Sequence, residues 1–255
     1  MNYKRSKYFL TSNKRKIKYL YLNKKSEITV VFFHGFMSDM IGAKPIAIQK
    51  FCNRHKINFL KFEYSGHGRS TGSFVKGNIS KWTNDAKQII KSKVKNKKKL
   101  IFIGSSMGSW IALNLFKIFR KQLIGFIGIA SAPEFTEEIM WKNFSKKIKK
   151  TILKDGIYYL ENDYEKPYPI TKNLIIDGRK NKVLNKKIYT KIQIVLFHGL
   201  KDNLVPLKFS KKIFKLAETN NKKIIKIKDG DHSLSRKKDL KKICSELGKM
   251  IKNIS

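Results

Sequence analysis

Largely apolar runs alternate along the chain with longer segments in which apolar residues recur at helical spacing. The runs 28–33, 100–103 and 192–199 have the length and the β-branched content of buried strands. Segments 44–56 and 79–95 instead place their apolar residues three and four positions apart, as an amphipathic helix does. Strands that are apolar on both faces and separated by helices indicate a mainly parallel sheet covered by helices on both sides. We therefore predict an α/β protein.

The same pattern predicts the other elements of the chain. Segments 7–11 and 17–23 are expected to form an antiparallel opening pair of strands. Further strands are predicted at 58–64, 123–131 and 223–229, and further helices at 109–122, 206–219 and 237–254.

Length and hydropathy fit one folded domain. The chain has 255 residues, of which 41% are hydrophobic, and this is enough to bury a core without disulfides or metals. Its apolar runs fall well short of the roughly 18 residues that a membrane-spanning helix needs. The basic N-terminal segment lacks the apolar stretch of a secretory signal. We therefore expect a cytoplasmic protein with no transmembrane segment, and the sequence leaves its oligomeric state open.

The two cysteines, Cys52 and Cys244, lie in predicted helices far apart in the sequence. An isolated pair does not make a disulfide framework, and the chain has no C-x-x-C motif or His/Cys cluster with the spacing of zinc ligands. We expect two reduced, mostly buried thiols and no bound metal.

The formal net charge of +39 is the strongest compositional bias. Such a charge attracts nucleic acids and anionic membranes. However, only seven of the 57 basic residues are arginine, and the lysines are spread over almost every predicted element. We interpret the charge mainly as compositional drift and expect no specific nucleic-acid partner. A polyanion-binding surface is the alternative.

Residues 104–108, Gly-Ser-Ser-Met-Gly, stand between a predicted strand and a predicted helix. In that context Gly-x-Ser-x-Gly is typical of a nucleophile elbow, which holds its central serine on a strained turn. The two glycines allow the strand and the helix to pack closely. Ser106 is therefore the predicted nucleophile.

A catalytic acid and base should follow in the order Asp, His. Asp202 comes after the strand at 192–199, and His232 comes after the last strand. The carboxyl ends of parallel strands share one edge of the sheet, so Ser106, Asp202 and His232 are expected to meet there. His232 would accept the proton of the serine hydroxyl, and Asp202 would orient the imidazole. Two alternatives stay open. Asp231 is a competitor of Asp202 for the role of the acid, and the loops that carry Asp202 and His232 could each be a turn with a structural role alone.

An oxyanion hole needs two backbone N–H groups. Met107, which follows the nucleophile, is predicted to supply one of them. Phe36, in the loop after the strand at 28–33, is the choice for the other because Gly35 lets the backbone turn inward, and Met37 is the alternative. His34 and His198 also lie at strand ends, where we expect structural roles.

Five motifs together resemble the α/β-hydrolase superfamily: FFHGF, YSGHGRS, GSSMGSW, HGLKDNLVP and GDHSLS. HGFMSDM, YSGHGRSTG and GSSMGSW are more specific. They resemble the branch that includes the mitochondrial palmitoyl-protein thioesterases, which also cleave the acyl glucuronide of mycophenolic acid, and bacterial relatives. The resemblance implies a serine esterase or thioesterase without metal or cofactor, with Ser106, Asp202 and His232 as its triad. One departure is Glu63, at a turn-bracing position where the family more often has Asp.

The resemblance also implies a cap inserted after the sixth strand. We expect a core formed by residues 1–132 and 185–255 and a cap formed by residues 133–184. The stretch from Glu134 to Glu165 supports an insertion, because its acidic and basic residues nearly balance in an otherwise basic chain. Seven aromatic residues of the cap either line an acyl pocket or pack the cap on the core: Phe135, Trp141, Phe144, Tyr158, Tyr159, Tyr164 and Tyr168.

The leading hypothesis is a hydrolase that cleaves carboxylic esters or acyl thioesters through an acyl-enzyme on Ser106. Its partner is a small-molecule or acylated-protein substrate. A peptidase or lipase that uses the same triad is one alternative. A non-catalytic, polyanion-binding protein on the same scaffold is the other.

Overall fold

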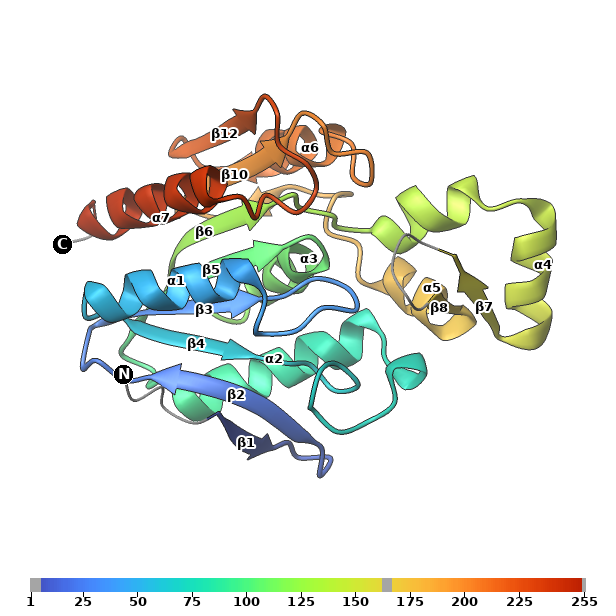
Figure 1. The fold of residues 1–255 in the computed structure, drawn as a ribbon, viewed down its shortest axis with the longest axis horizontal. Helices are drawn as coiled ribbons and strands as arrows, with labels where there is room; N and C mark the ends of the chain where they lie inside the picture. Colours follow the sequence, from blue (N-terminus) through green and yellow to red (C-terminus); the bar gives the residue numbers. More distant parts are fainter. Residues whose placement is uncertain (1–5, 162–166, 254–255) are drawn as a thin grey trace.

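The computed structural model describes residues 6–161 and 167–253. Its largest element is an eight-stranded sheet (Figure 1). The strands are β1 (Lys7–Leu10), β2 (Lys16–Leu22), β3 (Ile28–Phe33), β4 (Asn58–Phe62), β5 (Lys99–Ser105), β6 (Leu123–Ile129), β10 (Gln193–Gly199) and β12 (Lys222–Ile227). They lie in the order β1-β2-β4-β3-β5-β6-β10-β12. The first two pairs, β1 with β2 and β2 with β4, are antiparallel, and the others are parallel. The predicted α/β fold with a mainly parallel sheet is confirmed.

Helices cover both faces of this sheet. α1 (Ala43–Arg54) and α7 (Lys237–Lys252) lie on one face, whereas α2 (Ile79–Lys93), α3 (Met107–Leu115) and α6 (Lys208–Leu216) lie on the other. Successive side chains of a strand point to opposite faces. In β3, Val30 and Phe32 pack with the first pair of helices, and Val31 and Phe33 pack with the other three. The strand is therefore buried at every position.

One helix is shorter than predicted. We expected a helix over 109–122, but α3 ends at Leu115. Beyond it, the N–H groups of Phe116 and Ile118 donate to carbonyls only three residues back, at 3.2 and 3.0 Å. The chain tightens here because it must reverse into β6. The other predicted elements lie within three residues of the observed bounds.

Residues 133–184 lie beyond the carboxyl ends of the parallel strands (Figure 1). They contain the π-helix η2 (Thr136–Met140), the 3-10 helix η3 (Trp141–Asn143), α4 (Lys146–Asp155), the antiparallel pair β7 (Ile157–Leu160) and β8 (Tyr168–Thr171), and α5 (Lys172–Lys180). They also hold a small apolar cluster separate from the two clusters that cover the sheet. The division into core and cap stays a prediction, and Tyr164 lies outside the described residues.

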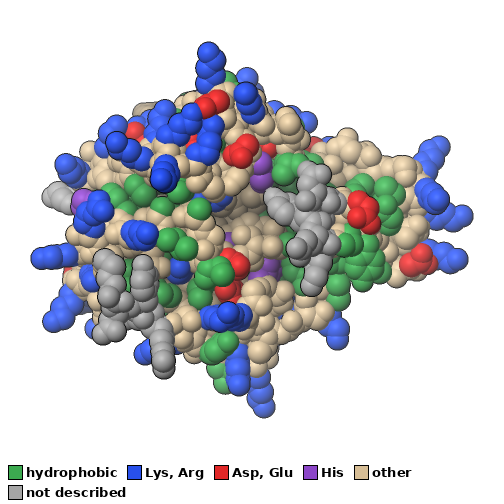
Figure 2. Space-filling model, in the orientation of Figure 1, with side chains coloured by type: hydrophobic (Ala, Val, Ile, Leu, Met, Phe, Trp, Pro, Cys, Tyr) green, Lys and Arg blue, Asp and Glu red, His purple; other side chains and the backbone are tan. Residues whose placement is uncertain are grey.

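Three shorter elements complete the described chain: the 3-10 helix η1 (Phe74–Lys76) and the paired two-residue strands β9 (Ile188–Tyr189) and β11 (Ala217–Glu218). Cys52 is buried, Cys244 is half-buried, and both are free thiols. Within residues 6–161 and 167–253, no helix is long and apolar enough to cross a membrane. Figure 2 shows Lys and Arg side chains over much of one face of the molecule rather than in a single patch.

Candidate active site

Ser106 stands in a one-residue turn between β5, which ends at Ser105, and α3, which begins at Met107. Its φ of 52° and ψ of −120° lie in a region that residues with a side chain rarely adopt. The N–H of Ser106 donates to the carbonyl of Ile129 in the neighbouring β6 at 2.9 Å, which helps to hold this backbone. The turn therefore has the strained geometry of a nucleophile elbow.

The two glycines of the motif make this turn possible. A Cβ on Gly108 would lie 2.1 Å from the carbonyl oxygen of Phe33 in β3, and a Cβ on Gly104 would lie 2.5 Å from Cα of Ser109. No side chain fits at such distances, so α3 can pack directly against the backbone of β3 and β5. This close packing fixes the position of Ser106 at the edge of the sheet.

The three residues predicted to act together do lie together. His232 Nε2 is 3.1 Å from Ser106 Oγ, and His232 Nδ1 is 2.8 Å from Asp202 Oδ2. A carboxylate accepts hydrogen bonds, so Nδ1 carries the proton and Nε2 is left to accept from the serine hydroxyl. The Asp202 side chain is fully buried, whereas that of His232 is 24% exposed.

Several donors hold the carboxylate of Asp202. Its Oδ1 accepts from the N–H groups of Leu204 and Val205 at 3.0 and 2.8 Å. Burial alone would raise the pKa of Asp202, but its hydrogen bond and attraction to His232, together with these two N–H donors, lower that pKa overall. The acid is therefore ionised at neutral pH and can stabilise an imidazolium.

Asp231, the alternative acid, is engaged elsewhere: its Oδ1 accepts from the N–H of Leu234 at 2.8 Å. His198 is fully buried, and its Nε2 bonds the carbonyl of Val205 while its Nδ1 bonds the hydroxyl of Ser210, both at 2.9 Å. Burial lowers the pKa of His198. This histidine is thus a neutral brace for the loop that carries Asp202, in the structural role we expected.

The predicted oxyanion donors flank the nucleophile. Met107 is the first residue of α3, and a Cβ on Gly35 would lie 3.5 Å from Cβ of Ser106, which places the start of the 35–42 loop against the serine. Neither the N–H of Phe36 nor that of Met107 donates to an acceptor within the described residues. Both groups are therefore free of a protein acceptor in that part of the chain, as the oxyanion hole predicted from the sequence requires. Met37, the alternative donor, has a left-handed φ of 49°.

His34 packs behind this loop. It is buried, its Nδ1 bonds the carbonyl of Gly35 at 2.8 Å, and its Nε2 accepts from the N–H of Tyr64 at 3.4 Å. Burial lowers the pKa of His34 to about 4, which keeps the ring neutral. The structure therefore places it as a brace of the 35–42 loop, as expected.

Glu63 also has the role we expected. Its Oε2 accepts from the N–H of Arg69 at 2.7 Å. A Cβ on Gly68 would lie 2.4 Å from the carboxyl carbon of Glu63, so the turn closes tightly over this side chain. The longer acid at this position still braces the turn of the GHGRS motif.

The ring of Phe36 connects the 35–42 loop to residues 133–184. It lies 5.4 Å from Phe135 and 5.7 Å from Tyr168 in that segment, and 5.0 Å from Phe74 in η1. Other aromatic residues of the segment have different surroundings: Phe144 packs against Tyr158, and Tyr159 is 55% exposed. Only part of the aromatic set therefore lies next to a predicted oxyanion residue.

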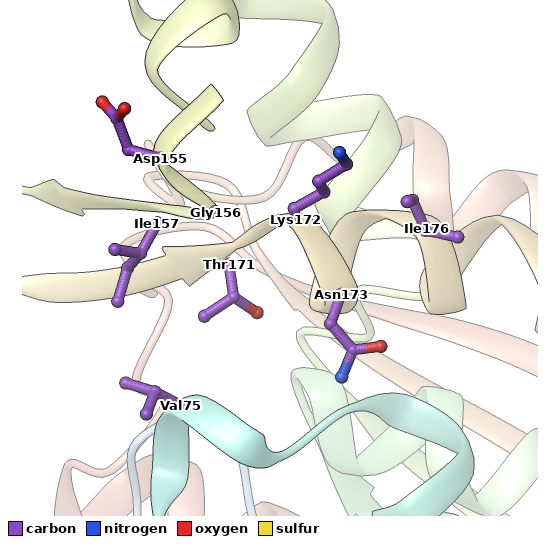
Figure 3. Close-up of a pocket in the computed structure, with 8 residues that line it drawn as sticks. All are labelled: Val75, Asp155, Gly156, Ile157, Thr171, Lys172, Asn173 and Ile176. Carbon is purple, nitrogen blue, oxygen red and sulfur yellow. The ribbon is translucent and has the colours of Figure 1, made fainter. Parts of the chain in front are cut away.

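A separate cavity of about 590 Å³ opens where β8 and α5 approach η1 (Figure 3). It is lined by Val75, Asp155, Gly156, Ile157, Thr171, Lys172, Asn173 and Ile176. None of these residues belongs to the Ser106 site. In the part of the chain that the structure describes, no group of three or more His, Cys, Asp or Glu side chains is arranged to hold a metal ion.

The sequence analysis did not single out Lys44. Its ammonium group donates to the carbonyl of Ser233, the residue after His232. A lysine at the first position of a predicted helix gives no local signal of a contact so far along the chain. The contact forms only when the fold brings residues 44 and 233 together.

Comparisons with known proteins identify the family to which the chain belongs. The hydrolase family model described as serine aminopeptidase, S33, matches residues 24–174. The bovine mitochondrial palmitoyl-protein thioesterase ABHD10 is 26% identical over 228 residues, which cover 89% of this chain and 74% of that protein. A pimeloyl-[acyl-carrier protein] methyl ester esterase from Wigglesworthia glossinidia brevipalpis is 28% identical over 195 residues, which cover 76% of this chain and 68% of that protein.

The solved structure of α/β-hydrolase domain-containing protein 10 from mouse superposes with a TM-score of 0.89 at 25% identity, covering 98% of this chain and all of that one. The ABHD10 relatives are named as mitochondrial proteins, so the cytoplasmic location expected for this chain is not confirmed. The fold, the family match and these relatives all indicate an α/β-hydrolase. The chain belongs to the serine aminopeptidase S33 family of α/β-hydrolases and is a relative of the ABHD10 branch.

Proposed function

We propose that this protein is a serine hydrolase that cleaves carboxylic esters or acyl thioesters through an acyl-enzyme on Ser106. The observation that carries the proposal is the continuous hydrogen-bond path from Ser106 through His232 to the ionised Asp202. A thioesterase and an ester hydrolase among the relatives support the substrate class.

The reaction follows from this path. As Ser106 Oγ attacks the carbonyl carbon, His232 Nε2 takes its proton and Asp202 stabilises the resulting imidazolium. The N–H groups of Phe36 and Met107 donate to the oxygen that becomes negative. The C–O or C–S bond then breaks, and the leaving alcohol or thiol takes the proton from His232. Water attacks the acyl-enzyme by the same route, releases the acid and restores Ser106.

We also propose that residues 133–184 form a cap over a core of residues 1–132 and 185–255. The separate apolar cluster of this segment and its position beyond the carboxyl ends of the strands support the division. The ring contacts of Phe135 and Tyr168 with Phe36 support a role for this segment in the site, because Phe36 is a proposed oxyanion residue. The cap would thus influence which acyl groups reach Ser106.

A fluorophosphonate probe tests the nucleophile, because it reacts with activated serines. We expect the wild type to be labelled and Ser106→Ala to be unlabelled. Ser105→Ala is the matched control, since its hydroxyl is one residue away in β5 and should not affect labelling. A wild type that resists the probe would overturn the proposal and favour a polyanion-binding protein.

A substrate series separates the remaining alternatives. We expect p-nitrophenyl esters and acyl thioesters to be cleaved with a rate that depends on acyl chain length. Faster cleavage of aminoacyl p-nitroanilides would instead identify a peptidase. A rate independent of chain length would contradict an acyl-binding role for the cap.

A further inference from the structure

His232 is carried by a connection of irregular structure, residues 228–236, between β12 and α7. Much of its bonding is local: the hydroxyl of Ser233 donates to that of Ser235 at 2.7 Å, and Leu234 N–H donates to Asp231. The beginning of the connection is anchored by the N–H of Lys201, which donates to the carbonyl of Gly230 at 2.8 Å. After His232, the fully buried side chain of Leu234 anchors the connection in the core, and a second anchor contacts its backbone.

Lys44, in the first turn of α1, provides that second anchor. Its Nζ donates to the carbonyl of Ser233 at 2.5 Å and lies 3.3 Å from Oγ of Ser235. Within the described residues, Lys44 has the only side chain from outside the connection that hydrogen-bonds residues 233–235. The contact joins α1 to Ser233, the residue that follows His232 in the chain.

We propose that Lys44 is a positioning residue for His232: its ammonium group clamps the backbone after the histidine and so holds the imidazole within reach of Ser106. The inference rests on the proposed function. Charge strengthens the contact, because a hydrogen bond from an ammonium group is about twice as strong as a neutral one. Displacing a catalytic group by even 1 Å can cost about 100-fold in rate.

The charge of this clamp depends on pH. Burial lowers the pKa of Lys44 to about 8, and the carboxylate of Asp231 opposes this shift. Above that pH the amine loses its charge, so the clamp weakens and kcat should fall. The same group does not destabilise the fold over this range. Between pH 8 and 10.5 the unfolded chain holds the Lys44 proton more tightly, so the contribution of Lys44 to stability rises with pH.

The experiment compares Lys44→Met, Lys44→Arg and the control Lys50→Met, which removes an exposed lysine from the same helix. With p-nitrophenyl acetate, we expect Lys44→Met to lower kcat about tenfold or more with little change in KM. Lys44→Arg, which keeps its charge, should recover most of the rate and move the alkaline decline to higher pH. Lys50→Met should match the wild type.

Melting temperatures measured at each pH separate a local effect from unfolding. A Lys44→Met protein with the kcat and the alkaline decline of the wild type would overturn the clamp. If Lys44→Met does not fold, an alkaline decline that is unchanged in Lys44→Arg would overturn it as well. Either result, obtained with a wild type that the fluorophosphonate labels, leaves the proposed function intact. An unlabelled wild type would overturn that function itself.

Discussion

His34 and His232 both follow strands of the same sheet edge, yet the structure gives them opposite properties. His34 is 1% exposed, contacts backbone groups and has a pKa lowered to about 4. His232 is partly exposed and lies between a hydroxyl and an ionised carboxylate. A histidine becomes a candidate base when its neighbours can stabilise its charged form and a reacting proton can reach it. Its place at a strand end is not sufficient.

Of the changes to these histidines, the removal of His232 should have the largest effect on activity. We expect His232→Ala to lower kcat by about 10⁵–10⁶-fold, because Ser106 then has no base and its hydroxyl stays protonated. The melting temperature should change little, since the lost contacts lie at a partly exposed site. Steady-state rates and thermal unfolding check both statements. Activity above one hundredth of the wild type would contradict the assigned base.

Acid should distinguish His34 by its effect on stability. The unfolded chain binds the His34 proton near pH 6.5, whereas the native chain resists it down to about pH 4. Stability from the neutral ring is thus complete above pH 6.5 and is lost as pH falls toward 4. The shift corresponds to about 3 kcal/mol.

Urea unfolding at pH 7 and pH 4.5 measures this loss. His34→Gln cannot take up the proton and should lose less stability between the two conditions. His67, a second buried histidine with a lowered pKa, contributes in the same direction and is unchanged in this variant. An equal loss in both proteins would exclude His34 as a source.

His198, the buried histidine beside the Asp202 loop, should show the smallest effect. His198→Ala removes the donor to the carbonyl of Val205, whose own N–H group holds the carboxylate of Asp202. We expect a loss of about 1–2 kcal/mol in unfolding free energy. The rate should fall by a smaller factor than in His232→Ala, with the same pH optimum. A loss of activity as large as that of His232→Ala would show that His198 takes part in proton transfer.

The sequence predicted the fold well where a local pattern determines it. The run 28–33 is apolar at all positions but Thr29 because both faces of β3 are covered, and its length gives the strand directly. The Ser106 motif was recognisable because Gly104 and Gly108 occupy positions where no side chain fits. Asp202 and His232 could be found because each follows a strand, and parallel strands deliver such residues to one edge.

Other features depend on contacts that no local pattern records. The early end of α3 reflects the need to enter β6 rather than any helix breaker after Leu115. The helices α4 and α5 lie in a segment whose residues pack largely against one another. Lys44 meets Ser233 only because α1 and the connection before α7 lie on the same face of the sheet.

The close packing of α3 against β3 has a consequence for how substrate preference can change among proteins with this architecture. With Phe33 and Gly108 in direct backbone contact, the nucleophile has almost no freedom to shift in response to a new substrate. Changes in substrate preference must therefore come from the surroundings of the serine. The loop that begins at Phe36 and the segment 133–184 are free of that steric limit, and they are where sequence variation can alter specificity at little cost to the chemistry.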